Sequence, residues 1–91
     1  SEIILTVEGV DPVELYGENN AKLNLLRKAF PDVVITARGN SLKITGDKKF
    51  TQTAKAKFEQ MVRYLREHQE LPAQTVSDLL GGENPFEVRI P

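Results

Sequence analysis

The feature that most constrains the fold is a short run, residues 15–26, in which one helix ends and a second begins. Asp11 followed by Pro12 is typical of a helix start, because the carboxylate can cap free N–H groups and proline suits the first helical position. Gly17 can adopt the left-handed conformation that ends a helix, and Asn20 can cap the next one. The sequence therefore predicts two helices joined by a four-residue turn, with backbone amides exposed where the second helix begins.

Exposed amides at a helix N-terminus are a place where a phosphate can bind. The turn is therefore the candidate ligand site, with Lys22 as a nearby cation. Arg38 and Lys43 fall on neighbouring predicted strands and could add a small cationic patch for a sugar–phosphate backbone. A lysine at the position of Lys22 is more often simply solvated. For Arg38 and Lys43 the alternative is a solvated sheet face that keeps the hairpin soluble. The candidate nucleic-acid-binding residues are Gly17, Glu18, Asn19, Asn20, Lys22, Arg38 and Lys43.

Apolar periodicity supplies the remaining elements. Alternation predicts strands over residues 2–8, 33–38 and 41–45, and Gly39-Asn40 is typical of the two-residue turn of a hairpin. Helical spacing predicts helices over residues 12–16, 21–30, 48–69 and 72–80. The order strand, helix, helix, strand, strand, helix, with a short C-terminal helix, predicts an α+β domain. Its three-stranded antiparallel sheet is expected to be covered by helices on one face.

The longest predicted helix carries a continuous apolar stripe, which indicates the centre of the core. Its members recur at steps of three or four residues: Phe50, Ala54, Phe58, Met61 and Leu65. Arg27 and Lys28 fall in the last turn of the preceding helix, where cations complement the helix dipole. Their expected role is therefore structural.

Composition excludes several classes of function. The chain has 91 residues and no cysteine, so it is expected to be one domain without disulfides or thiol chemistry. Its net charge of −1 makes extensive phosphate binding unexpected. No apolar run approaches the roughly 18 residues of a membrane helix, so a cytoplasmic protein without membrane contact is expected. The single histidine, His68, has no second histidine at ligand spacing, and neither catalysis nor a metal site is expected.

The spacing Gly17-x-x-Asn20, followed by Leu23 and Leu26 and later by the hairpin and a long helix, resembles a type I KH domain. In that family a Gly-x-x-Gly turn clamps the backbone of about four nucleotides. The resemblance implies a KH-like βααββα domain over residues 1–82. Two departures stand in the turn itself: Asn20 replaces the second glycine, and Glu18 places an acid where a basic residue is frequent.

A closer resemblance is to the N-terminal region of PhoH-like (phosphate starvation-inducible) proteins. The segments that carry it are residues 7–20, 36–40 and 44–47, within a likeness from about Ile3 to Leu80. It implies a bacterial, cytoplasmic, ATP-binding, RNA-associated protein in which this domain precedes a P-loop NTPase domain. Residues 83–91 would then be a tail or linker toward that domain. The chain contains no Gly-x-x-x-x-Gly-Lys-Ser/Thr, so ATP and Mg²⁺ are implied for the full-length protein and no cofactor or enzymatic activity for this fragment.

Two hypotheses of different kinds follow. In the first, the domain binds single-stranded RNA weakly through residues 17–22, with help from Arg38 and Lys43. In the second, a degenerate KH fold serves as a docking or oligomerisation module, packing on the NTPase domain or on a copy of itself. The alternating tail, residues 86–90, would then add a strand to a sheet edge.

Overall fold

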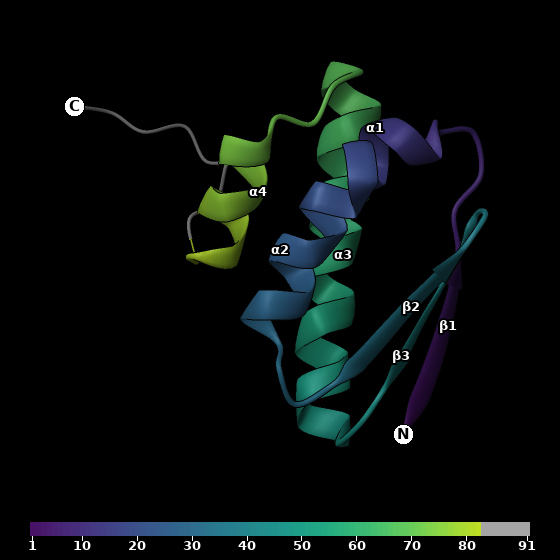
Figure 1. Cartoon of the computed structure of the whole chain (residues 1–91), viewed down its shortest axis with the longest axis vertical. Helices are drawn as coiled ribbons and strands as arrows, with labels where there is room; N and C mark the ends of the chain where they lie inside the picture. Colours follow the sequence, from purple (N-terminus) through teal and green to yellow (C-terminus); the bar gives the residue numbers. More distant parts are fainter. Residues whose placement is uncertain (83–91) are drawn as a thin grey trace.

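The computed structural model describes residues 1–82 of the chain (Figure 1). The α+β class and the three-stranded antiparallel sheet that the sequence predicts are confirmed. The elements, in chain order, are β1 (Glu2–Thr6), α1 (Pro12–Tyr16), the 3₁₀ turn η1 (Glu18–Asn20), α2 (Ala21–Ala29), β2 (Val34–Arg38), β3 (Ser41–Thr45), α3 (Lys48–His68) and α4 (Ala73–Leu80).

The sheet has the order β1-β3-β2, so the last of the three strands within residues 1–82 is the central one. Both neighbours of β3 run antiparallel to it, with Ile44 opposite Ile3 on one side and Ile35 on the other. β2 and β3 form the predicted hairpin. Gly39 supplies the positive φ (53°) that a two-residue hairpin turn requires at its first position.

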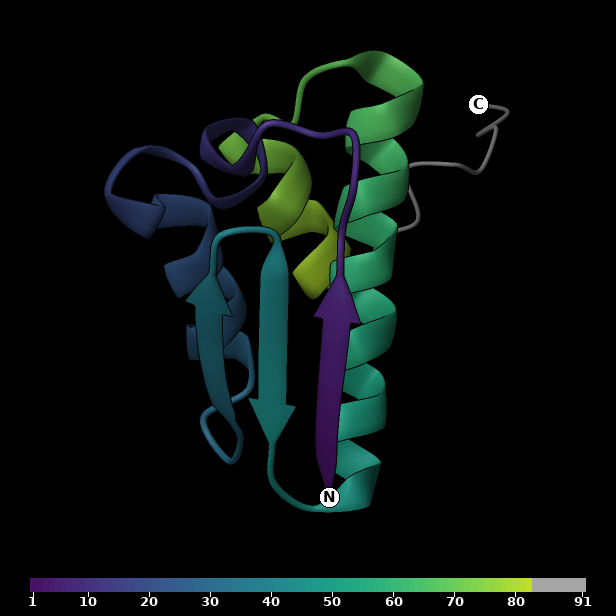
Figure 2. The same cartoon turned by 90° about the vertical axis from the view of Figure 1, so that its right-hand side faces the viewer.

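The helices cover one face of the sheet, and the core lies between the two layers (Figure 2). Leu42 and Ile44 of the central strand are fully buried there, as are most members of the predicted α3 stripe. Phe50, at the start of that stripe, is only partly buried. The opposite face of the sheet is open, and two of its apolar side chains, Ile4 and Val34, are 62% and 66% exposed.

The helix ends agree with those that the sequence predicts, but only some of the predicted capping side chains make a capping hydrogen bond. The Asp11 carboxylate accepts a hydrogen bond from the Val13 amide (2.9 Å), as expected for a cap. Phe30, before Pro31, leaves the helical region (φ −128°, ψ 68°) and ends α2. The prediction that the Asn20 side chain caps its helix is wrong, because this residue occupies the cap position of α2 without a side-chain hydrogen bond.

The predicted tail, residues 83–91, lies outside the described residues. Within residues 1–82, no helix is long and apolar enough to cross a membrane.

Candidate nucleic-acid interface

The turn between α1 and α2 contains three residues that depart from right-handed backbone geometry. Gly17 has φ 81° and ψ 165°, a region that only glycine occupies readily. Asn19 and Asn20 follow in the left-handed helical region, with φ 54° and 59°. Asparagine is the residue, after glycine, that tolerates this region best. The backbone of the predicted site is therefore specified by the residues at these three positions.

Part of the hydrogen-bonding capacity of the turn is used inside it. The Asn20 amide donates to the Gly17 carbonyl (3.1 Å), and the Ala21 amide donates to the carbonyl of Glu18. Within the described residues, the amides of Glu18 and Asn19 have no backbone acceptor. The amides available to an anion are therefore those in the middle of the turn. The expectation that exposed amides lie where the second helix begins, at Asn20, is corrected accordingly.

The turn lines a shallow depression together with the exposed side of α1. The lining consists of Pro12, Val13, Tyr16 and the four turn residues 17–20, and it encloses about 470 Å³. Val13 is 60% exposed. The depression thus combines an apolar wall with the unpaired amides of the turn.

Lys22 lies against the turn, but its charge is already engaged. Its Nζ donates to the backbone carbonyl of Glu14 in α1 (2.7 Å). Its stem packs close to Gly17, where an added Cβ would lie 3.1 Å from Lys22 Cγ. A cation on the last carbonyls of a helix stabilises the helix end. Lys22 therefore joins α2 to α1.

The structure brings Arg38 and Lys43 to one place, on the open face of the sheet. They line a second depression, about 310 Å³, with Ile4, Thr36 and Ser41. Lys43 Nζ lies 3.2 Å from a carboxylate oxygen of Glu2, and both side chains are about half exposed. This depression shares no residue with the one at the turn. The seven predicted residues therefore occupy two separate surfaces.

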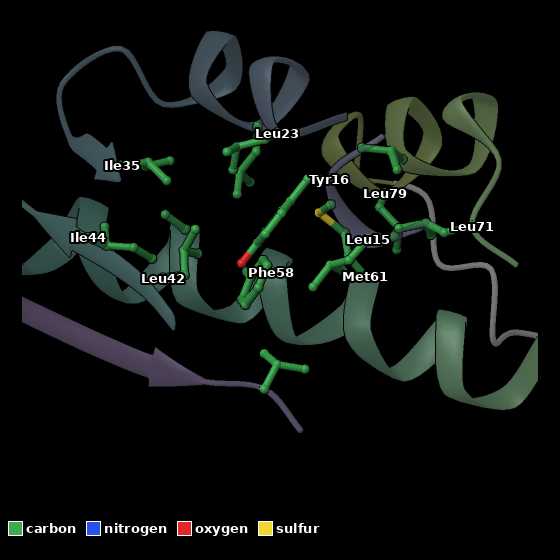
Figure 3. Close-up of a cluster of buried hydrophobic side chains, with 14 of the residues drawn as sticks. Leu15, Tyr16, Leu23, Ile35, Leu42, Ile44, Phe58, Met61, Leu71 and Leu79 are labelled. Carbon is green, nitrogen blue, oxygen red and sulfur yellow. The ribbon is translucent and has the colours of Figure 1, made fainter. Parts of the chain in front are cut away.

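Tyr16 is a residue of this region whose position the sequence did not indicate. Its ring is 6% exposed and extends into the core toward Phe58, while it also lines the depression at the turn (Figure 3). Its hydroxyl is buried and has no hydrogen-bond partner among the described residues. Burial raises the pKa of the Tyr16 hydroxyl above its ordinary value.

The other sequence expectations concern residues away from these surfaces. His68 is exposed at the end of α3, and its ring lies 4.2 Å from that of Tyr64. Within residues 1–82, no group of three or more histidine, aspartate or glutamate side chains is placed to hold a metal ion. Arg27 has the structural role expected of it, although through a contact that the sequence did not predict: its Nε donates to the Ile35 carbonyl (3.1 Å).

Comparisons with protein-family models, with curated proteins and with solved structures found no match for this chain. Its function is therefore inferred from the arrangement of its elements and from the residues of the two surfaces.

Proposed function

We propose that this chain is a non-catalytic, KH-like domain of a PhoH-like ATP-binding protein and that it contacts single-stranded RNA weakly through the turn at residues 17–20. The observation that carries the proposal is the position of that turn. A helix–turn–helix unit stands between β1 and β2, and the sheet order β1-β3-β2 with a long following helix is compatible with a type I KH arrangement. ATP binding belongs, in this proposal, to the P-loop domain that the resemblance implies.

The depression at the turn suits a nucleotide chain in two ways. A backbone phosphate could accept hydrogen bonds from the amides of Glu18 and Asn19, which have no backbone acceptor within residues 1–82. The exposed apolar side chain of Val13 lies in the same depression and can support a base. The contact combines a phosphate position with an apolar surface.

The charges around the turn indicate that this binding is weak. Glu18 repels a phosphate, and the ammonium of Lys22 is already bound to a carbonyl of α1. Arg38 and Lys43 lie on a different surface, where Lys43 is paired with Glu2. Affinity is therefore expected to be micromolar or weaker and to fall steeply with salt.

An NMR titration of the labelled domain with a short single-stranded RNA at low salt tests this directly. We expect shifts confined to residues 17–22 and to the exposed side of α1. In a Glu18→Lys variant the affinity should rise severalfold, because the change removes a repulsive charge and adds an attractive one at the site. Glu59→Lys, on the exposed surface of α3, makes the same change of net charge elsewhere and is the matched control. Absence of shifts at residues 17–22 at low salt would refute the proposal.

A second candidate function is a docking or oligomerisation module. It is favoured by the exposed apolar side chains of Ile4 and Val34 on the open sheet face and by the acid in the turn. An edge of the sheet would receive an alternating segment such as residues 86–90. Sedimentation of the chain with and without residues 83–91 tests self-association: a monomer in both cases would argue against it.

A further inference from the structure

The hydrogen bonds of β1 show which of its backbone groups face its neighbour β3. Two bonds bracket the ladder: from the Val7 amide to the Asn40 carbonyl (2.8 Å) and from the Gly46 amide to the Ser1 carbonyl (3.0 Å). In an antiparallel ladder, pairs that exchange hydrogen bonds alternate with pairs that do not. The odd-numbered residues of β1 therefore bond to β3.

The even-numbered residues Glu2, Ile4 and Thr6 consequently direct their N–H and C=O groups away from β3. β1 is an edge of the sheet, so these groups face outward. A row of unpaired backbone groups of this kind is a template for a further strand.

The other edge of the sheet, β2, has a side chain bound to one of its outer backbone groups. β2 presents the backbone groups of Ile35 to its outer side, and Arg27 donates to that carbonyl from α2 (3.1 Å). The guanidinium is held in place by a second bond, from Nη1 to the Asn24 side chain (3.0 Å). Of the two edges, β2 is therefore partly covered by a side chain of the domain, whereas no hydrogen bond from the described part of the chain covers the outer side of β1 over residues 2–6.

An apolar groove runs beside the open edge. It encloses about 490 Å³ between β1 and α3, and its lining is Leu5, Thr6, Val7, Phe58, Val62 and, along the rim, Glu59, Arg63, Arg66 and Glu67. Figure 2 shows α3 passing behind β1 and extending beyond its outer side. A strand added to β1 would therefore lie over α3, with alternate side chains directed into the groove.

We infer that this edge and groove bind residues 86–90 of a second copy of the chain as an added strand. Phe86, Val88 and Ile90 alternate with Glu87 and Arg89. Because side chains alternate between the faces of a sheet, the three apolar residues can all face the groove. The two charged residues then lie on the open face. The inference deepens the second proposed function and is independent of RNA binding.

The path of the chain favours a second copy over the same molecule. Figure 1 places α4 on the far side of α2 and α3 from the sheet, and the Lys57 ammonium ties α4 to α3 at the Leu79 carbonyl (2.8 Å). Three residues separate Gly82 from Phe86, a stretch of at most about 14 Å. A helix with its side chains is already about 10–12 Å across, so this stretch is too short to pass around α3 and reach β1.

Amide hydrogen exchange combined with sedimentation tests the inference on the whole chain and on residues 1–82. In the whole chain we expect a concentration-dependent dimer in which exchange at Ile4 and Thr6 slows by at least about tenfold relative to residues 1–82. Ile3 and Leu5 are the internal control, because their amides bond to β3 in both proteins.

A pair of substitutions in the tail separates a strand in the groove from an unspecific contact. Val88→Asp places a charge toward the groove and should abolish both the dimer and the protection of Ile4. Arg89→Asp introduces the same acid on the opposite side and should retain both. Neither residue belongs to the described fold, so a far-UV spectrum matching that of the parent is expected for each.

The outcomes are distinguishable. A dimer without protection of Ile4 and Thr6 would overturn the inference and leave the oligomerisation function standing. A monomer at all concentrations would overturn both. Protection of Ile4 and Thr6 in a chain that sediments as a monomer would show that the strand comes from the same molecule and would overturn the choice of a second copy.

Discussion

At the scale of single residues, Tyr16 combines a favourable ring with an unfavourable hydroxyl. The ring fills the core between α1 and α3, whereas the buried oxygen has no partner within residues 1–82. A buried hydroxyl without a hydrogen bond costs about 1–3 kcal/mol. Tyr16→Phe should therefore raise the free energy of unfolding by about 1 kcal/mol, measured by urea denaturation at pH 7. A loss of stability would mean that the hydroxyl is hydrogen-bonded in solution.

Ionisation of the same hydroxyl lowers the free energy of unfolding at alkaline pH. Because burial raises its pKa in the folded state, the native protein holds this proton more tightly than the unfolded chain does. Its contribution to stability is complete below the unfolded pKa of about 10 and is lost as pH rises through the higher folded value. The parent should lose stability above about pH 10 more steeply than Tyr16→Phe.

The two ends of the turn differ in what they require of a side chain. Gly17 occupies a region that costs other residues about 1–3 kcal/mol, and an added Cβ would press on Lys22 at 3.1 Å. Gly17→Ala should therefore destabilise by about 1–3 kcal/mol. Asn20, at φ 59° and ψ 30°, is in a region that asparagine and glycine both adopt. Asn20→Gly should change stability by less than about 1 kcal/mol, as thermal unfolding will show.

At the scale of the elements, Arg27 links α2 to the outer edge of β2. Removing its side chain takes away the bonds to the Ile35 carbonyl and the Asn24 side chain. Arg27→Ala should cost about 1–2 kcal/mol, measured by chemical denaturation. Lys28→Ala removes an equal charge from an exposed position in the same turn and should stay within about 0.5 kcal/mol. Equal losses in the two variants would mean that the charge, and not the edge contact, is what matters.

The contact between α3 and the sheet depends on Phe58. It is 1% exposed and lies in the middle of the stripe that faces the core. Phe58→Ala should destabilise by about 3–5 kcal/mol, which is a large part of the total for a domain of this size. Phe50→Ala, at the partly buried start of the stripe, should cost clearly less in the same denaturation experiment.

At the scale of the whole molecule, the sequence predicted what depends on local pattern. The bounds of α3 and of the hairpin follow from apolar spacing and from Gly39-Asn40, and the structure agrees within one or two residues. The hydrogen bonds between different elements, in contrast, could not be predicted from local sequence pattern. Lys22 binds a carbonyl eight residues before it, and Arg27 a carbonyl eight residues after it. Such bonds join different elements, so they depend on how the elements pack and leave no periodic signal.

The burial of Tyr16 and the separation of the two surfaces are missed for the same reason. A tyrosine at the end of a five-residue helix has too short a context for its face to be assigned. Arg38 and Lys43 were correctly placed on one sheet face, but their distance from the turn depends on the position of α1 and α2 above the opposite face. The position of each residue within its own helix or strand was therefore predictable. The arrangement of the two surfaces relative to each other was not.

The central position of β3 has a consequence for synthesis of the chain. Each strand pairing in the described sheet needs residues 41–45, so β1, although made first, has no partner until some forty later residues have left the ribosome. The hairpin can close early because its contacts are local, whereas docking of the first strand awaits a loop closure across α1 and α2. During that interval the apolar residues of β1 are open to chaperones and to neighbouring nascent chains.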